Sequence, residues 1–220
     1  MRLPHGYTNE TELTAAGDVR KCYVGKDAKA RQQVEAACLT ALTTVLPVPA
    51  VVAVEGDATL MQLRPGEHGQ DLLEQGHGEA VLLLAGQLLR RLGAVSPALV
   101  MGLGGQGEHV VHGDFGPQNM LFDLGRESVT AVLDWEYAHR GDPIEDLAWC
   151  EWIVRMHHPD QVSLLRSLFA GYGERPPWAA RRQIMIEKCE LFEERSRAQG
   201  PENARALWAE RRQLVRTWHA

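Results

Sequence analysis

The segment "VVHGDFGPQNMLFD", residues 110–123, constrains the fold of this chain more than any other. It sets a histidine, two aspartates and an asparagine among apolar residues, with a turn at Gly116-Pro117. A buried strand does not carry His-Gly-Asp in its interior, and a surface loop is not bracketed by Val-Val and Met-Leu-Phe. The segment therefore predicts two short strands that hold a polar loop, in which Asp114 and Asn119 are fixed relative to each other.

The two parts of the chain on either side of residue 64 differ in pattern. The first part favours the order strand, strand, helix, strand, strand, with the helix over residues 27–46. The second part is mostly helical, with a break at Pro176-Pro177. We therefore expect an α+β fold with a β-rich N-terminal domain, residues 1–64, and a helical C-terminal domain, residues 65–220. A cleft between them is the natural place for a ligand.

A second strand and loop supply a third polar side chain. Asp134 follows the apolar run "VTAVL" and precedes Trp135. Two strand–loop units place Asp114, Asn119 and Asp134 at one edge of a hairpin. Carboxylate and amide oxygens suit Mg²⁺ rather than zinc, and a carboxylate that binds no metal can accept a proton from a hydroxyl. Phosphoryl transfer needs this combination of metal ions and an orienting carboxylate.

The pair "HGDFGPQN" and "LDWE" resembles the catalytic core of the aminoglycoside phosphotransferase and choline kinase-like family, which has a two-lobed protein-kinase-like fold. The resemblance implies that Asp114 is the catalytic base and that Asn119 and Asp134 bind Mg²⁺. It makes His112 a buried, hydrogen-bonded residue that shapes the loop rather than a nucleophile. "GDPIEDLAW" extends the resemblance, and we expect Asp146 within it to anchor the catalytic loop through backbone hydrogen bonds.

The resemblance continues into the N-terminal part. "DVRKCYV" resembles the strand that carries the nucleotide lysine, which makes Lys21 the candidate for the α- and β-phosphates. Glu35 on the following helix is the candidate for its ion-pair partner. Lys26 and Lys29 lie nearby, and a solvated position is the common alternative for any lysine.

Two further segments resemble nucleotide-binding parts of the family. "HGYTNETEL" resembles the phosphate-covering loop and implies that Gly6, Thr8 and Asn9 contact the nucleotide, although it has one glycine where protein kinases have three. "TLMQLRPG" resembles the connector between the lobes, whose backbone is expected to bind adenine near Gln62 and Leu63.

The resemblance covers about residues 5–155, and the chain departs from the family in two ways. It begins close to the phosphate loop, so we expect a truncated N-lobe whose first strand is short or absent. It is also shorter than expected of the family. Both departures leave open how completely the nucleotide is covered and how complete the acceptor pocket is.

The acceptor is expected against the helical domain. "IEKCELFEERSRAQ" places Glu187, Glu190 and Glu194 on one helical face, which can hold the ammonium groups of an aminoglycoside or a choline-like cation. The alternative, which we favour, is a solvated face whose glutamates pair with Lys188 and nearby arginines. Trp149 and the other tryptophans offer aromatic surface for a sugar or a cation, but at helical spacing most tryptophans are core residues.

The sequence therefore predicts an ATP-dependent O-phosphotransferase that acts on a hydroxyl of a small molecule, with an aminoglycoside-type antibiotic as one acceptor. The alternatives are a metabolite kinase for choline, homoserine, a sugar or a fructosamine, and a catalytically idle kinase-like binding module. The short N-lobe and the poor phosphate loop favour the idle module, whereas the retained metal ligands speak against it. A protein kinase is disfavoured because the sequence has no Ala-Pro-Glu-like segment and no recognisable activation loop between Asp134 and the turn at Gly141. The few residues between them leave little room for a peptide-binding platform. The choice between ATP and GTP and the oligomeric state stay open.

Composition narrows the setting. The net charge is −6, which argues against a general nucleic-acid binder. The N-terminus lacks an apolar signal core, and the longest apolar run is too short and too interrupted to span a bilayer. The cysteines are scattered and predict reduced thiols in a cytoplasmic protein; they are Cys22, Cys38, Cys150 and Cys189.

Overall fold

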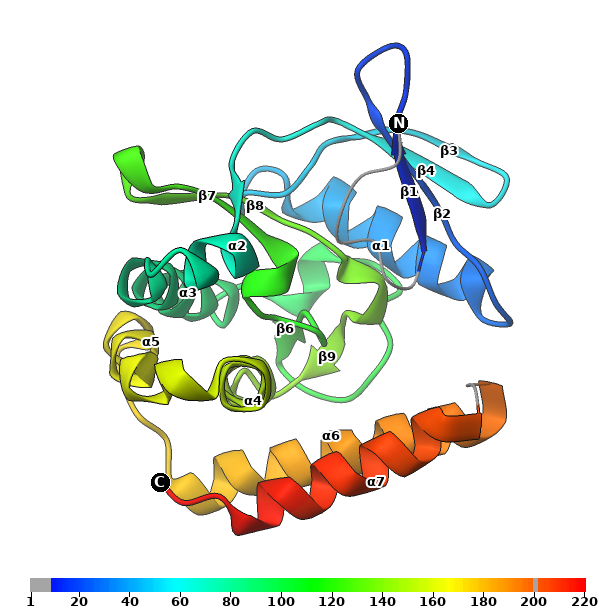
Figure 1. The fold of residues 1–220 in the computed structure, drawn as a ribbon. Coiled ribbons are helices and arrows are strands. Elements are labelled where there is room, and N and C mark those ends of the chain that lie inside the picture. Colours follow the sequence, from blue (N-terminus) through cyan, green and yellow to red (C-terminus); the bar gives the residue numbers. More distant parts are fainter. Residues whose placement is uncertain (1–8, 200–201) are drawn as a thin grey trace.

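The computed structural model describes residues 9–199 and 202–220. Its N-terminal part is an antiparallel sheet of four strands with one helix packed on it (Figure 1). The spatial order of the strands is β1-β2-β4-β3. The predicted order of strand, strand, helix, strand, strand is confirmed; the elements are β1 (Glu10–Leu13), β2 (Val19–Cys22), α1 (Ala28–Leu42), β3 (Val51–Glu55) and β4 (Ala58–Met61).

The helix α1 packs on this sheet through an apolar stripe that also carries two polar residues. Cys38, Leu39 and Leu42 are fully buried, as expected for the inner face of an amphipathic helix. Gln32 and Glu35 lie on the same buried face. The side-chain amide of Gln32 donates to the carbonyl of Ala58 over 2.8 Å, so this buried amide has a hydrogen-bond partner. The buried carboxylate of Glu35 has its partners in the site described below.

Short strands in the middle of the chain hold the polar loop of residues 112–119. The two strands that flank the loop do not pair with each other. β6 (His109–Val111) pairs with β9 (His139–Gly141), and β7 (Met120–Asp123) pairs with β8 (Ser128–Val132). β5 (Glu67–His68) adds a third strand beside β7. The loop is therefore fixed by two separate sheets.

The C-terminal part is helical, and the helices α3 and α5 cross where each carries a glycine. A β-carbon at Gly86 would lie 2.1 Å from the carbonyl oxygen of Leu168, and one at Gly171 would lie 2.1 Å from that of Leu83. Any side chain there would force the helices apart. The helices of this part are α2 (Gly69–Glu74), α3 (Gly78–Leu92), α4 (Ile144–His157), α5 (Leu165–Tyr172), α6 (Trp178–Gln199) and α7 (Glu202–Thr217).

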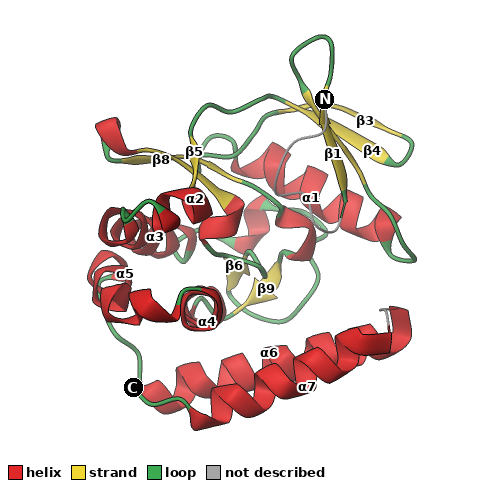
Figure 2. Cartoon of the chain, in the orientation of Figure 1, coloured by secondary structure: helices red, strands yellow, loops and turns green. Residues whose placement is uncertain are grey.

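The last two helices form a long antiparallel hairpin along one side of the molecule, drawn at the bottom of Figures 1 and 2. α6 packs on α4 through a second apolar cluster, separate from the main core. A buried ion pair also joins these helices: the Glu151 carboxylate on α4 bonds to Arg181 on α6 and to Arg155 one turn along α4. The apolar cluster consists of Ala148, Trp149, Trp152, Ile153, Met185, Cys189 and Val215.

Two further features bear on the predictions about the cysteines and about membrane spans. The four cysteines, all in the described part of the chain, are free thiols. Within residues 9–199 and 202–220, no helix has both the length and the apolar character that a membrane crossing needs.

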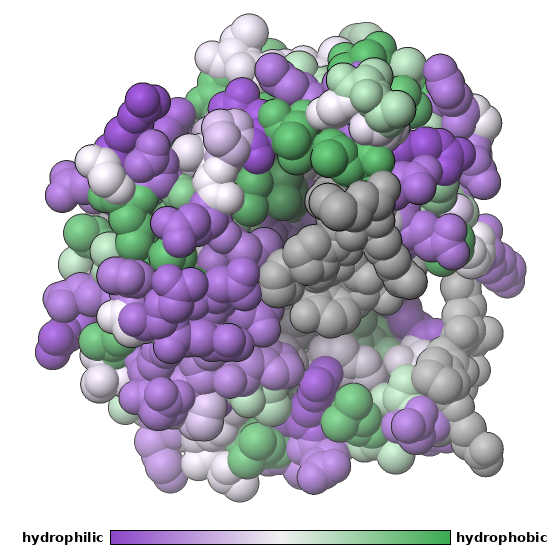
Figure 3. Space-filling view, turned by 45° about the horizontal axis from the view of Figure 1, so that its top comes forward, coloured by the Kyte–Doolittle hydropathy of each residue, from purple (hydrophilic) through white to green (hydrophobic). Residues whose placement is uncertain are grey.

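The face shown in Figure 3 is strongly hydrophilic at its lower left, while hydrophobic side chains gather towards its top. The α+β fold is confirmed, and the lobe boundary between residues 64 and 65 stays a prediction.

Candidate active site

His112 and Gly113, in the predicted catalytic loop, are fixed by hydrogen bonds from several directions. Asp146, at the start of α4, accepts bonds from the main-chain N–H groups of His112 (2.6 Å) and Gly113 (2.9 Å). The fully buried His112 ring accepts a bond from the main-chain N–H of Asp114 and donates its Nε2–H to Leu133. Gly113 has φ 83°, and a β-carbon there would lie 2.3 Å from the carbonyl of Tyr137, so glycine is required.

The carboxylate of Asp114 is held by one donor on each oxygen. Oδ1 accepts from the indole N–H of Trp149 over 2.8 Å, and Oδ2 accepts from the side-chain amide of Asn119 over 3.0 Å. Burial raises the pKa of Asp114, while the positive charge of Lys188 and the bond from Trp149 act in the opposite direction. Each oxygen keeps a further lone pair, so the carboxylate can still accept a proton.

Asn119 and Asp134 lie on neighbouring backbone segments. The main-chain N–H of Leu133 donates to the carbonyl of Asn119 over 2.9 Å, which brings Asp134 beside Asn119. Asp134 has left-handed backbone geometry, with φ 64° and ψ 57°, which is uncommon for a residue other than glycine. Within the described part of the chain, the amide oxygen of Asn119 and Oδ2 of Asp134 accept no hydrogen bond. Two hard oxygen donors thus face one cavity, which fits a Mg²⁺ ion.

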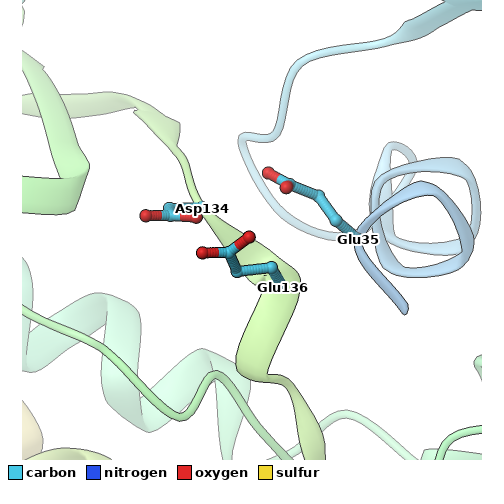
Figure 4. A group of neighbouring side chains, drawn as sticks. All are labelled: Glu35, Asp134 and Glu136. Carbon is cyan, nitrogen blue, oxygen red and sulfur yellow. The ribbon is translucent and has the colours of Figure 1, made fainter. Parts of the chain in front are cut away.

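Three carboxylates lie close together, Glu35 from α1 and Asp134 and Glu136 from the segment after β8 (Figure 4). The ammonium group of Lys21 pairs with all three. Its Nζ lies 2.6 Å from Glu35, 2.6 Å from Asp134 and 3.9 Å from Glu136. Burial acts to lower the pKa of Lys21, but the three carboxylates together raise it well above its usual value. The hydroxyl of Tyr23 also donates to Glu35 over 2.7 Å. The predicted pair of Lys21 and Glu35 is present in the structure.

Glu136 links the segment that carries Asp134 to α1 and to the residue that precedes β1. Its buried carboxylate accepts from Arg31 of α1 over 2.5 Å and from the side-chain amide of Asn9 over 2.8 Å. Asn9 lines the cavity, but its amide group donates to Glu136, and its predicted contact with the nucleotide stays a prediction. Burial raises the pKa of Glu136, and the charge of Lys21 opposes that rise.

A cavity of about 600 Å³ lies between the N-terminal sheet and the loop that carries Asp114 and Asn119. This volume is typical of a small-molecule site. Gln62 and Leu63, the expected adenine-binding positions, lie on its rim, although the main-chain N–H of Gln62 already donates to Ala50 over 2.8 Å. The other predicted residues that line the cavity are Asn9, Lys21, Glu35, Asp114, Asn119 and Asp134.

Of the remaining predicted residues, those that the structure describes do not line this cavity. Gly6 and Thr8 lie outside the described residues. Glu190 on α6 pairs with Arg212 of α7 over 3.2 Å, which turns it towards the hairpin. Glu187 and Glu194 are exposed, and neither lines the cavity within the described part of the chain. The acceptor role of these three glutamates stays a prediction.

Sequence reasoning missed three residues that contact the predicted site. Trp149 is a core residue as expected, and its indole N–H also holds Asp114; its position three residues after Asp146 on a helix was an available signal for that contact. Lys188 was expected to pair with solvated glutamates, and that expectation is wrong: it donates to the carbonyl of Gly113. Glu136 was visible as the acid in "LDWE", but nothing local showed that it would bond Arg31 of α1.

Known proteins match parts of this sequence. The sequence pattern of the family described as "Phosphotransferase enzyme family" matches residues 104–184, which contain the catalytic loop and the second metal-ligand candidate. Mouse acyl-CoA dehydrogenase family member 10 is 48% identical over 57 residues, 26% of this chain and 5% of that protein. Hygromycin-B 4-O-kinase of Escherichia coli is 44% identical over 52 residues, 22% of this chain and 15% of that protein. The chain thus matches only a small part of each curated relative's length.

The solved structures show the fold. The complex of APH(2")-IIia with GDP and kanamycin superimposes with a TM-score of 0.75 over 98% of this chain and 92% of that one, at 14% identity. The chain has the kinase-like fold of the aminoglycoside phosphotransferases. The resemblance to the phosphotransferase enzyme family is confirmed, and together the matches support the class of small-molecule phosphotransferase enzymes.

Proposed function

We propose that this protein transfers the γ-phosphoryl group of ATP or GTP to a hydroxyl of a small molecule, with Mg²⁺ as cofactor. The observation that carries the proposal is that Lys21, Asp114, Asn119 and Asp134 line one cavity. A proton acceptor, two metal ligands and a phosphate-binding cation are the groups that phosphoryl transfer requires. The idle binding module is disfavoured because all of these groups are retained.

Asp114 is the residue proposed to act on the acceptor. A hydroxyl seated beside its carboxylate would be oriented towards the γ-phosphorus and would give its proton to the carboxylate as the new oxygen–phosphorus bond forms. The bond from the γ-phosphorus to the bridging oxygen breaks, and the nucleoside diphosphate leaves with that oxygen. No covalent intermediate on the protein is needed.

Asn119 and Asp134 are proposed to hold the Mg²⁺, and Lys21 to bind the phosphates. When bound, the metal neutralises charge on the β- and γ-phosphates. Lys21 contributes a cation whose position is fixed by the carboxylate of Glu35. Because Asp134 shares Lys21 with Glu35, these residues can place the metal and the phosphates in a fixed relation.

The acceptor class is proposed from the relatives' own ligands. The similar structure binds kanamycin and GDP, and the matching E. coli protein is a hygromycin-B kinase. An aminoglycoside-type antibiotic is therefore the first acceptor to test, with choline, homoserine, sugars and fructosamines as the metabolite set. The proposed setting is the cytoplasm, where nucleotide and Mg²⁺ are available.

The test is a panel of these hydroxyl compounds with Mg²⁺-ATP or Mg²⁺-GTP, followed by release of nucleoside diphosphate and by phosphate on the acceptor. Asp114→Ala should lower transfer at least about 100-fold, because general-base catalysis contributes about that much or more. Asp123→Ala, in a hairpin away from the cavity, is the matched control and should retain activity. Transfer by Asp114→Ala close to wild type would overturn the role of Asp114, and no transfer to any compound would overturn the function.

A further inference from the structure

The bond from Trp149 to Asp114 is made by a side chain that is itself held in one orientation. Trp149 is 3% exposed, and its ring stacks on Trp152 with centroids 4.3 Å apart and planes at 7°. The ring of Phe192, from α6, lies 5.5 Å away on a tilted plane. An indole packed in this way cannot rotate without displacing α6, so its N–H points at Oδ1 of Asp114 in a fixed direction.

Lys188 brings a positive charge to the same ring from α6. Its Nζ lies 4.6 Å from the centroid of Trp149, within the range of a cation–π contact, and donates a hydrogen bond to the carbonyl of Gly113. Burial lowers the pKa of Lys188, while the charges of Asp146, Asp114 and Glu145 act to keep it protonated. One ammonium group therefore bridges the helical hairpin, the indole and the backbone beside the catalytic aspartate.

We propose that Trp149 and Lys188 are a pair of positioning residues for the phosphoryl transfer proposed above, on which this inference rests. Trp149 fixes the rotation of the Asp114 carboxylate through its indole N–H, and Lys188 fixes Trp149 and the Gly113 peptide. Trp149 holds Oδ1 of Asp114 and Asn119 holds Oδ2, so the plane of the carboxylate is fixed. Its free lone pairs therefore point in a fixed direction, from which they can accept the proton of a hydroxyl. Neither residue touches the nucleotide in this scheme, so their effect falls on the chemical step.

The kinetic test replaces only the N–H group. Trp149→Phe keeps an aromatic ring for the stack and for Lys188 but removes the bond to Asp114. It should lower kcat by about 10- to 100-fold, the effect of losing one hydrogen bond to a charged group, and leave the nucleotide KM within about twofold. Trp152→Phe perturbs the same stack without touching Asp114, and should change kcat less than about threefold. Equal losses in the two variants, or a parallel rise in nucleotide KM, would overturn the proposal.

The second residue is tested by charge and by coupling. Lys188→Met removes the ammonium and should lower kcat about tenfold, whereas Lys188→Arg keeps a cation and a donor and should recover most of the loss. Because the two residues act on one carboxylate, the double variant of Trp149→Phe and Lys188→Met should lose less than the product of the single losses. If the losses of the two single variants multiply fully in the double variant, or if Lys188→Arg does not recover kcat, Lys188 has only a structural role.

A readout without an acceptor separates this inference from the proposed function. In an NMR spectrum of the ¹⁵N-labelled protein, the Trp149 indole signal, assigned through Trp149→Phe, should move on Asp114→Asn while the Trp152 signal stays in place. If no compound is phosphorylated by the wild type but the Trp149 signal responds, the proposed function fails and the holding of Asp114 stands. If the Trp149 signal does not respond, the positioning pair is overturned whatever the acceptor panel shows.

Discussion

The carboxylate of Asp146 accepts the main-chain N–H of His112 over 2.6 Å, and its second oxygen accepts the N–H of Gly113 over 2.9 Å. Asp146 stands in the first turn of α4, and the two peptides stand directly after β6. One buried side chain therefore joins the C-terminal helical layer to the loop that carries Asp114. The backbone of this loop is held by Asp146 in addition to the hydrogen bonds that its own side chains make.

The first prediction concerns this anchor. Asp146→Asn replaces one acceptor oxygen with an amide that donates, so one buried main-chain N–H loses its partner. The free energy of unfolding should fall by about 1–3 kcal/mol, and kcat should fall with it because the loop is less fixed. Urea unfolding measures the first effect and steady-state kinetics the second. Asp57→Asn, in an exposed turn with a side chain 76% accessible, is the control and should change stability by less than about 0.5 kcal/mol.

The second prediction concerns nucleotide binding. Lys21→Met keeps the length of the side chain but removes the cation that lies between Glu35 and Asp134. The dissociation constant for Mg²⁺-ATP or Mg²⁺-GTP should rise about 10- to 100-fold, since a charge-assisted bond to phosphate is lost and three carboxylates remain close to it. Calorimetry measures the change, with Lys26→Met, an exposed lysine ahead of α1, as the control. Unchanged affinity in Lys21→Met would remove Lys21 from the nucleotide site.

The third prediction is a pH dependence. His139 donates to Glu145 over 3.0 Å; this bond raises the pKa of His139, although burial opposes it. A raised folded pKa stabilises the protein fully below the unfolded value of about 6.5, and the contribution is lost as pH rises through the folded value. Burial acts to raise the pKa of Glu145, but the hydrogen bonds from His139 and Asp142 lower it below its usual value. The carboxylate therefore contributes to stability above its unfolded pKa of about 4.3, and this contribution is lost as pH falls below that value.

The pair should therefore stabilise most between about pH 4.5 and 6.5 and weaken towards pH 8. Both side chains are about one third exposed, so the difference should stay below about 1 kcal/mol. Denaturant unfolding of wild type and Glu145→Gln at pH 6 and pH 8 measures it, and an NMR titration of His139 checks its origin. Substituting the exposed His219 by glutamine should leave the difference unchanged. If the stability difference between wild type and Glu145→Gln grows from pH 6 to pH 8, the predicted direction of the pH dependence is wrong.

The sequence predicted those site residues that lie close together along the chain. Asp114 and Asn119 share one loop, and Asp134 follows the next strand of the same hairpin, so spacing and pattern were sufficient to group them. The contact of Lys188 with the site could not be predicted from the sequence, because α6 is polar on nearly every side. Only the packing of α6 against α4 decides which residues of α6 face inward. The pairing of Glu190 with α7 depends in the same way on a contact between helices.

The last prediction tests what places α6, and with it Lys188, against the catalytic loop. Glu151 is fully buried on α4 and bonds both Arg155, over 2.9 Å, and Arg181 near the start of α6. Glu151→Gln leaves two largely buried guanidinium groups without their counter-charge, and removing one partner of such a pair typically costs about 3–5 kcal/mol. Thermal and urea unfolding should show a loss of that order.

The matched control is Glu187→Gln, the same change at an exposed position of α6, which should alter stability by less than about 0.5 kcal/mol. If α6 is positioned by this ion pair, Glu151→Gln should also weaken the response of the Trp149 indole signal to Asp114→Asn, because Lys188 then loses its fixed place beside the ring. A fully stable Glu151→Gln would show that the apolar cluster between α4 and α6 alone holds the hairpin. An unstable variant with an unchanged indole response would show that Trp149 keeps its orientation without α6.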